Sequence, residues 1–157
     1  MKTFYKIIIY FMNMRYFSDV YKLGELDDKY FIYKIDNYNN IASVRIHQFF
    51  TIYFPVFRLS EILLYTYSDD ERRYVLYHEL GHFKLKHHLR FISIFDKNAL
   101  MELEYEADEY AMNIVGKEVT LKGMKKTRNI LIELGCKIDA IDDRIVVLEL
   151  KDECICG

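Results

Sequence analysis

The sequence predicts an α+β fold, with most of the strands in the first half of the chain and most of the helices in the second. β-branched and aromatic residues gather in short runs in the first half, whereas the second half contains long segments with helix caps and few helix breakers. The chain has 157 residues, of which 52% are apolar and 29% charged, with one Pro and six Gly. A chain of this size and composition is expected to fold as one domain, residues 1–157, rather than to be disordered.

The first half is expected to supply an antiparallel or mixed sheet. Tyr30–Ile35 and Ile41–Ile46 are rich in aromatic and β-branched residues and flank a turn-forming cluster at 36–40, so we predict a hairpin-like pair. Pro55 cannot donate to a sheet ladder, which places its own run at a sheet edge or a strand end. The run Glu61–Tyr67 is interpreted as a further strand.

No segment is predicted to cross a membrane or to direct secretion. The N-terminal run, residues 1–17, has only a short apolar stretch and no small-residue cleavage site, so it is interpreted as a first strand or helix. The apolar run Phe49–Phe57 is far shorter than the roughly 18 residues that span a bilayer. Three cysteines do not indicate a disulfide framework, and Cys154 and Cys156 are too close in sequence to form a good metal site. We therefore expect a cytoplasmic protein.

Capping and stop signals define three helices in the second half. Ser68, followed three residues later by Glu71, forms a capping box, and the helix after it is expected to run to about His88 or Leu89. Glycines are expected to end the next two helices, at Gly116 and Gly135. These two helices are predicted at about Asp96–Val115 and at Leu121–Leu134, and a late strand is predicted at Arg144–Leu150.

The first of these helices carries His78-Glu79-Leu80-Gly81-His82, an HExxH pattern. Four residues advance a helix by about 400°, so the two imidazoles lie on one face, one turn apart, where both can bind one tetrahedral zinc ion. Glu79 lies beside them and can reach a water on the metal rather than the metal itself. Gly81 leaves room for another element to approach. The alternative is a coincidental pattern on a charged helix, and a third ligand decides between the two.

Two residues compete to be that third ligand. His88 lies six residues after His82, but the segment between them favours continued helix, which would turn His88 about 240° away from His82. Glu104 lies in the second helix, about 60° from the centre of its apolar stripe, on the inward margin. A carboxylate there is costly unless it meets a cation, which favours Glu104 over the alternative that it faces water. Asp108, one turn later, can accept a hydrogen bond from the far nitrogen of a liganding imidazole.

Other polar residues near the pattern receive no firm role. His87 and His88 are expected to be ordinary residues at a solvated helix end. If the site is catalytic, an oxyanion that forms on the substrate needs a hydrogen-bond donor. The chain has 14 tyrosines, so nearness in sequence does not choose among the candidate donors Tyr74, Tyr105, His87 and Tyr110.

The run HELGHFKLKHH, followed 22 residues after His82 by EYEADEYA, resembles the ImmA/IrrE family of metallopeptidases, whose members carry HELGHxxLxH and then E-x-x-A-[DN]-x-[FY]-A. The resemblance covers residues 62–115 well and the flanks poorly. It implies a small zincin-like metallopeptidase domain, in which a sheet packs on the HExxH helix and on a second, Glu-bearing helix. The motif core would lie at about 61–116, followed by a C-terminal helix and strand at 117–157. Carried over residue by residue, it implies Zn²⁺ bound by His78, His82 and Glu104, with Glu79 as catalytic base and Asp108 in a supporting position.

The activity implied by this resemblance is zinc-dependent hydrolysis of peptide bonds in a protein substrate. In that family the substrate is typically a helix-turn-helix repressor of a bacterium, phage or mobile element. This chain has no recognisable helix-turn-helix, and its 22 Lys and Arg against 24 Asp and Glu give a net charge of −2, so direct contact with nucleic acid is not expected. The alternative is a non-catalytic, zinc-stabilised interaction module that binds a repressor or toxin partner. A structural zinc usually has four protein ligands, and only three are evident here, which favours the enzyme.

Overall fold

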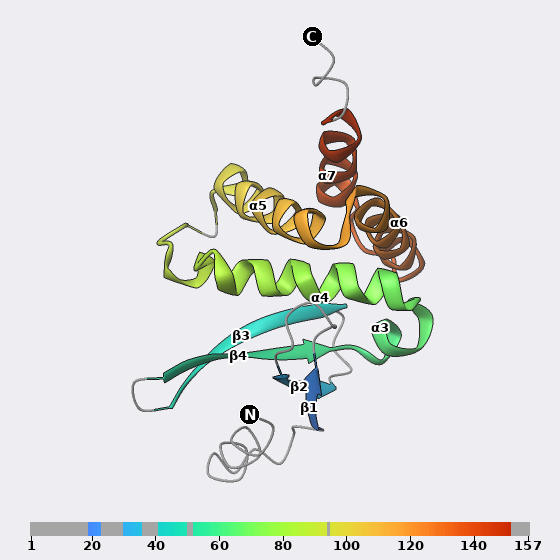
Figure 1. The fold of residues 1–157 in the computed structure, drawn as a ribbon. Coiled ribbons are helices and arrows are strands. Elements are labelled where there is room, and N and C mark those ends of the chain that lie inside the picture. The colour runs from blue at the N-terminus through green and yellow to red at the C-terminus, as the bar shows by residue number, and fades with distance from the viewer. Residues whose placement is uncertain (1–18, 23–29, 36–40, 50–51, 94, 152–157) are drawn as a thin grey trace. The chain divides into compact units, whose positions relative to one another are not determined.

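The computed structural model describes residues 19–22, 30–35, 41–49, 52–93 and 95–151 (Figure 1). The chain divides into two compact units, residues 1–66 and 67–157. The described strands and one short helix belong to the first unit, and the longer helices belong to the second, so the predicted α+β class is confirmed. The expected first element at 1–17, the turn cluster at 36–40 and the cysteines at 154 and 156 lie outside the described residues. A single domain over residues 1–157 stays a prediction.

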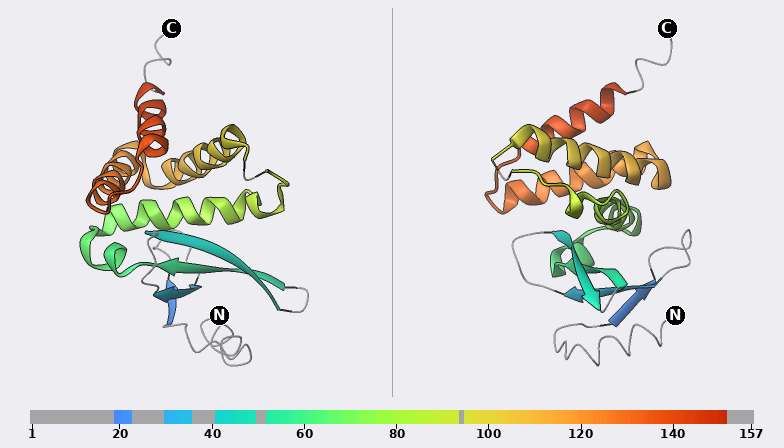
Figure 2. Two further views of the ribbon diagram at one scale, coloured as in Figure 1. Left: turned by 180° about the vertical axis from the view of Figure 1, so that it is seen from behind. Right: turned by 90° about the vertical axis from the view of Figure 1, so that its left-hand side faces the viewer.

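The first unit contains a mixed four-stranded sheet (Figures 1 and 2). Its strand order is β1-β2-β4-β3, with β2 parallel to β4 and the other two pairings antiparallel. β3 and β4 pair along their whole length, from Ala42 opposite Leu59 to Phe49 opposite Ile52. The strands are β1 (Asp19–Lys22), β2 (Tyr30–Ile35), β3 (Ala42–Phe49) and β4 (Ile52–Leu59).

The predicted pairings of these strands need two corrections. The expected hairpin of Tyr30–Ile35 with Ile41–Ile46 is wrong, because β4 lies between β2 and β3. Local β propensity identifies the strands but does not say which of them are neighbours. Pro55 lies in the interior strand β4 rather than in an edge strand, opposite Ile46 of β3. The pairing with β2 starts only at Val56, so the position of Pro55 faces a neighbouring strand on one side alone.

The predicted strand at Glu61–Tyr67 is wrong, because Glu61–Thr66 forms the helix α3. Ser60 precedes this helix, and its Oγ accepts a hydrogen bond from the backbone N–H of Leu63 at 3.1 Å, as a helix N-cap does. Leu63 is fully buried. The residue types of this apolar run favour a strand, whereas the hydrogen bond from Leu63 to Ser60 favours a helix start.

The second unit is helical (Figure 2). Each of its four long helices contributes buried apolar residues. α4 packs against both α5 and α6, and α7 packs against α6 and α5. The described part of the chain contains no helix both long enough and apolar enough to cross a membrane. The elements of this unit are α4 (Asp69–Lys84), the 3₁₀ turn η1 (His87–Leu89), α5 (Lys97–Val115), α6 (Lys117–Glu133) and α7 (Asp139–Leu150).

The predicted start of α4 is confirmed, and its end comes earlier than expected. Ser68 and Glu71 form the capping box, in which Glu71 accepts from the Ser68 backbone N–H at 2.7 Å. The helix stops at Lys84, and Lys86 adopts the left-handed conformation, with φ 58° and ψ 36°. A residue with a Cβ seldom takes this conformation, so the residue types do not predict that the helix ends here.

Glycines end α5 and α6 as predicted. Gly116 follows α5 with φ 88°, and Gly135 follows α6 with φ 69°, both in the region that favours glycine. Asp96 caps α5 by accepting from the backbone N–H of Ala99 at 3.0 Å. α6 starts directly after Gly116, four residues before its predicted start at Leu121.

The predicted strand at Arg144–Leu150 is wrong, because these residues form most of helix α7. The valines and isoleucines favour a strand locally, but the buried positions are Ile141, Ile145 and Leu148, which have helical spacing. An ion pair holds α7 on α6, with Arg128 Nε 2.5 Å from Asp142 Oδ1. Packing against the rest of the unit therefore outweighs the local propensity.

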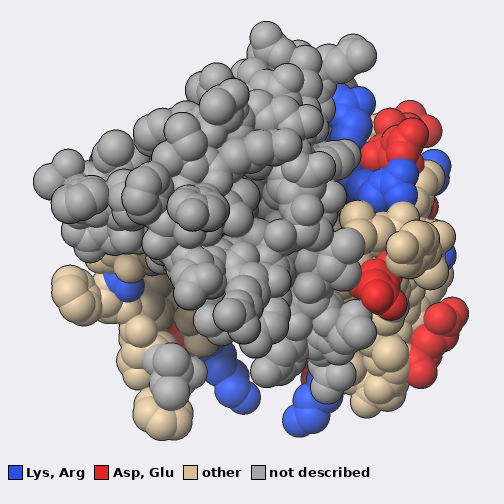
Figure 3. Space-filling model, turned by 90° about the horizontal axis from the view of Figure 1, so that it is seen from below, with Lys and Arg blue, Asp and Glu red and all other residues tan. Residues whose placement is uncertain are grey.

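The described surface visible in Figure 3 shows no field of one sign. Where Figure 3 shows described residues, basic and acidic side chains lie beside one another. This agrees with the nearly balanced charge of the whole sequence. In that view the described residues form no basic face of the kind that binds the phosphate backbone.

Candidate metal centre

The two histidines of the HExxH pattern face the same point in space. They lie one turn apart on α4, and their Nε2 atoms are 3.2 Å apart. α4 and α5 approach closely here, since a Cβ built on Gly81 would lie 3.2 Å from the Cα of Ala107. Ala107 and Ala111 are completely buried. The small residues at this crossing therefore set how near α5 comes to the two imidazoles, as the sequence indicates.

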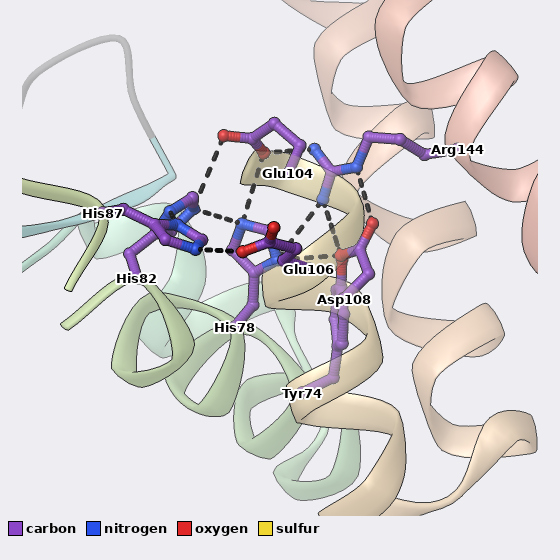
Figure 4. A network of polar contacts seen from close by, with 8 residues as sticks. All are labelled: Tyr74, His78, His82, His87, Glu104, Glu106, Asp108 and Arg144. Carbon is purple, nitrogen blue, oxygen red and sulfur yellow. Dashed lines mark hydrogen bonds and ion pairs between the residues drawn. The ribbon is translucent and has the colours of Figure 1, made fainter. Parts of the chain in front are cut away.

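Glu104 reaches both histidines from α5 (Figure 4). Its Oε2 lies 3.3 Å from His78 Nε2, and its Oε1 lies 3.4 Å from His82 Nε2. One ligand atom from each of the three residues lies within 4.8 Å of the others, close enough to bind one metal ion. His88, the competing candidate, is exposed, and its ring stacks on Phe83.

Asp108 lies behind His78 and is almost fully buried. Its Oδ1 is 2.8 Å from His78 Nδ1, the imidazole nitrogen that points away from the metal position. The hydroxyl of Tyr74 donates to the same carboxylate at 2.9 Å. Tyr74 in turn lies against Gly123 of α6, where a Cβ would come within 2.3 Å of its ring. Tyr74, one of the tyrosines without an assigned role, is therefore a partner of Asp108.

Arg144 joins the two carboxylates, and sequence reasoning missed it. Its Nη1 donates to Glu104 Oε2 at 2.7 Å. Its Nε and Nη2 donate to the two oxygens of Asp108, both at 2.7 Å (Figure 4). The guanidinium is a rigid fork suited to such a two-oxygen contact. The residues after Arg144 favour a strand locally, and nothing in that run points to Glu104 or Asp108.

His87 is also part of the centre, and the expectation that it is an ordinary residue at a solvated helix end is wrong. It is buried, with its Nδ1 2.7 Å from His82 Nδ1 and its Nε2 2.9 Å from Glu106 Oε2. Arg90 forms an ion pair with the same Glu106, at 2.7 Å. The left-handed Lys86 turns the chain back toward α4, and a helical reading of this segment conceals that turn.

The pKa values of the two histidines move in opposite directions. Burial alone would lower the pKa of His78, but hydrogen bonds to Asp108 and Glu104 outweigh it and raise that pKa to about 9. Burial and the neighbouring charge of His78 lower the pKa of His82 to about 4. Burial also lowers the pKa of His87. At neutral pH His78 is therefore protonated in the absence of metal, and His82 is neutral.

The two carboxylates remain ionised. Burial would raise the pKa of Glu104, but the hydrogen bond and charge of His78, with the charge of Arg144, bring it down to about 2. Against a similar cost of burial, His78 and Arg144 hold the pKa of Asp108 well below its usual range. The positive charges of His78 and Arg144 thus balance the negative charges of Glu104 and Asp108.

Glu79 is half-buried on α4 and follows His78 directly. On an α-helix it lies about 60° from His82, on the side away from His78. This places its carboxylate next to the face that carries both ligands. Tyr105 and Tyr110, two other candidates for stabilising an oxyanion, are half-buried on α5.

Comparison with known protein families finds a similarity in the second unit. Residues 72–138 match the family model described as Peptidase U49. The matched segment includes His78, Glu79, His82, Glu104 and Asp108, and it ends before Arg144. The match indicates a peptidase family, and with it a hydrolase. Neither the comparison with curated proteins nor the comparison with solved structures returned a match.

Proposed function

We propose that this protein is a zinc-dependent endopeptidase with a zincin-like site, related to the ImmA/IrrE metallopeptidases. The observation that carries the proposal is the convergence of His78, His82 and Glu104 from two helices, inside the segment that matches a peptidase family. Three protein ligands leave a coordination position open, which distinguishes a catalytic zinc from a structural one.

The donor set fits zinc. Two imidazole nitrogens and one carboxylate oxygen are ligands that suit a borderline cation such as Zn²⁺ and are less suited to the oxygen-binding Mg²⁺ or Ca²⁺. The three side chains come from rigid helices packed at Gly81. When bound, the ion would supply Lewis acidity, lowering the pKa of a water and polarising the scissile carbonyl.

Each of the chain's own residues then has a distinct task. Glu79 takes a proton from the attacking water at its carboxylate and later gives it to the nitrogen of the leaving amine. Asp108 accepts from His78 Nδ1, which holds the ring so that Nε2 faces the ion. Arg144 donates to one oxygen of Glu104 and to both oxygens of Asp108, so it fixes the positions of the two carboxylates relative to each other.

The proposed substrate is a protein, specifically a helix-turn-helix repressor of the bacterium, phage or mobile element that encodes the enzyme, and the proposed compartment is the cytoplasm. The charge supports this choice, because a net charge of −2 suits an enzyme that acts on a DNA-binding protein without contacting DNA.

The test separates an enzyme from a non-catalytic module. Glu79→Gln should keep about one zinc per chain by inductively coupled plasma mass spectrometry, yet slow cleavage of a co-expressed repressor encoded nearby by at least ~100-fold, because it removes the general base. Glu102→Gln, the same change at an exposed position of α5, is the matched control and should cleave at the wild-type rate.

The metal itself needs a second pair of variants. His82→Ala should lose the zinc, whereas His88→Ala, which changes an exposed histidine, should keep it. A wild-type protein without zinc would contradict the proposal. A Glu79→Gln variant as active as wild type would contradict the enzyme and leave the interaction module.

A further inference from the structure

A second chain of hydrogen bonds leads away from the candidate metal centre on the His82 side. His82 Nδ1 lies 2.7 Å from His87 Nδ1, and His87 Nε2 lies 2.9 Å from Glu106 Oε2. The side chain of His87 is only 4% exposed. A buried imidazole with a partner at each nitrogen is held in one orientation.

The backbone is shaped to bring His87 into this position. On a continued α-helix His87 would lie about 140° around from His82 and could not reach it. The helix instead ends at Lys84, and Lys86 takes the left-handed conformation. Among the described residues, Lys86 is the one non-glycine residue with a positive φ. Unfavourable backbone conformations of this kind concentrate at functional sites.

The chemistry of the chain gives each contact a direction. The ionised carboxylate of Glu106 can only accept, so the hydrogen of the 2.9 Å contact lies on His87 Nε2. A neutral His87 then offers a lone pair at Nδ1, so the hydrogen of the 2.7 Å contact lies on His82 Nδ1. His82 is left with its lone pair on Nε2, the atom that faces His78 and Glu104.

We propose that His87 and Glu106 are positioning residues that hold His82 in the one tautomer whose Nε2 can bind the metal. The proposal rests on the metal site of the proposed function and goes beyond it, because it assigns a role to residues outside the ligand set and its carboxylate support. Glu106 is itself fixed by Arg90, whose Nη1 donates to Oε1 at 2.9 Å and whose Nη2 is 2.7 Å from Oε2.

The two ligand histidines are thus supported by different means. His78 is oriented directly by a buried carboxylate, Asp108, whereas His82 is oriented through a second imidazole by a partly exposed one, Glu106. The His82 route uses the turn after α4 and one residue of α5. It shares no residue with the His78 route, so the two can be tested separately.

The first experiment measures metal affinity in the full-length protein. Metal-free wild type, His87→Ala and His87→Asn are titrated with Co²⁺ in competition with a chelating indicator, and the absorption bands of bound Co²⁺ are recorded. Loss of such a supporting partner typically weakens metal binding by about 10–100-fold, which is the result expected for His87→Ala. The amide oxygen of Asn can replace Nδ1 as acceptor, so His87→Asn should recover most of the affinity. His88→Ala, the neighbouring exposed histidine, is the matched control and should bind Co²⁺ like wild type.

The second experiment observes the tautomer directly. In the zinc-loaded protein labelled with ¹⁵N at histidine, the His82 Nδ1 signal should be that of a protonated nitrogen, and the His87 Nδ1 signal that of an unprotonated one. Glu106→Ala, which leaves His87 in place, should weaken Co²⁺ binding and let His87 populate both tautomers. This variant also provides the affinity test if His87→Ala does not fold.

The outcomes separate this inference from the proposed function. Wild type that binds no Co²⁺ would overturn both. Wild type that binds Co²⁺ with an affinity unchanged in His87→Ala and Glu106→Ala, or an unprotonated His82 Nδ1, would overturn the inference alone. Equal loss in His88→Ala would also overturn it, because the effect would then not belong to the hydrogen-bond chain.

Discussion

His78 holds a proton where a metal ion would bind. Its Nε2 faces Glu104 and His82, and its pKa of about 9 keeps it charged at neutral pH. Metal and proton therefore compete for one nitrogen.

This competition predicts the pH dependence of metal binding. Between about pH 5 and pH 9 the metal-free site carries one proton on His78, whereas His82, with a pKa of about 4, carries none. Binding should release about one proton at pH 7, and affinity should fall about tenfold for each pH unit of acidification. Calorimetry of metal binding in two buffers of different ionisation enthalpy measures the protons released. A value near zero would show that His78 is neutral before the metal binds.

The proximity of the three candidate ligands could be predicted from the sequence, and some of the residues that contact them could not. The spacing of His78 and His82, and the angle of Glu104 from the apolar stripe of its helix, depend only on regular helix geometry. The positions of Arg144 and His87 depend on tertiary structure. Arg144 lies 40 residues after Glu104, on a helix whose residue types favour a strand. His87 follows Lys86, which has the left-handed conformation. Neither feature leaves a periodic pattern in the sequence.

At the scale of elements, α7 is tied to the candidate centre by one residue. Arg144 is mostly buried, with 12% of its side chain exposed, and it lies between the carboxylates of Glu104 and Asp108. Arg128 on α6 makes a comparable pair with Asp142, but both side chains are about one-third exposed. The two arginines therefore provide a matched comparison of buried and exposed ion pairs.

Arg144→Met should lower the free energy of unfolding of the metal-free protein by about 3–5 kcal/mol, because it removes one of the two cations that balance Glu104 and the buried Asp108. Arg128→Met should cost less than about 1 kcal/mol. Urea denaturation of both variants measures the difference. Equal effects would mean that the Arg144 cluster adds no more stability than a surface pair.

The sequence predicts some helices correctly and mistakes two others for strands. Caps and glycines identified the starts or ends of α4, α5 and α6, because these signals act locally. The segments 61–67 and 144–150 were read as strands from their apolar, β-branched composition. Two features indicate helices instead. Ser60 caps the start of the first segment. The buried residues of the second have helical spacing, at Ile141, Ile145 and Leu148.

At the scale of the whole molecule, the helical unit has a core of its own that does not depend on a metal. Its buried apolar residues come from all four long helices. The polar cluster is also balanced in charge without an ion. This differs from small zinc domains, which are unfolded when the metal is removed.

Removal of the metal by a chelator should therefore leave the fold intact. The far-ultraviolet circular dichroism of the helices should not change, while the midpoint of thermal unfolding should fall and recover when zinc is returned, since the ion binds the folded state alone. Loss of the helical signal on chelation would show that the metal is structural, which would favour the interaction module over the enzyme.

The contact at Gly81 also affects the size of the cage that the side chains of His78, His82 and Glu104 form. His78 and His82 come from α4 and Glu104 from α5, so the separation of the two helices sets the width of the cage. A methyl group at position 81 would require its neighbours to give by a few tenths of an ångström. That is also the difference between zinc–ligand distances of about 2.0–2.2 Å and calcium–oxygen distances of about 2.3–2.6 Å. A substitution of Gly81 by Ala is therefore expected to widen the space between His78, His82 and Glu104 by an amount that matters for a small cation.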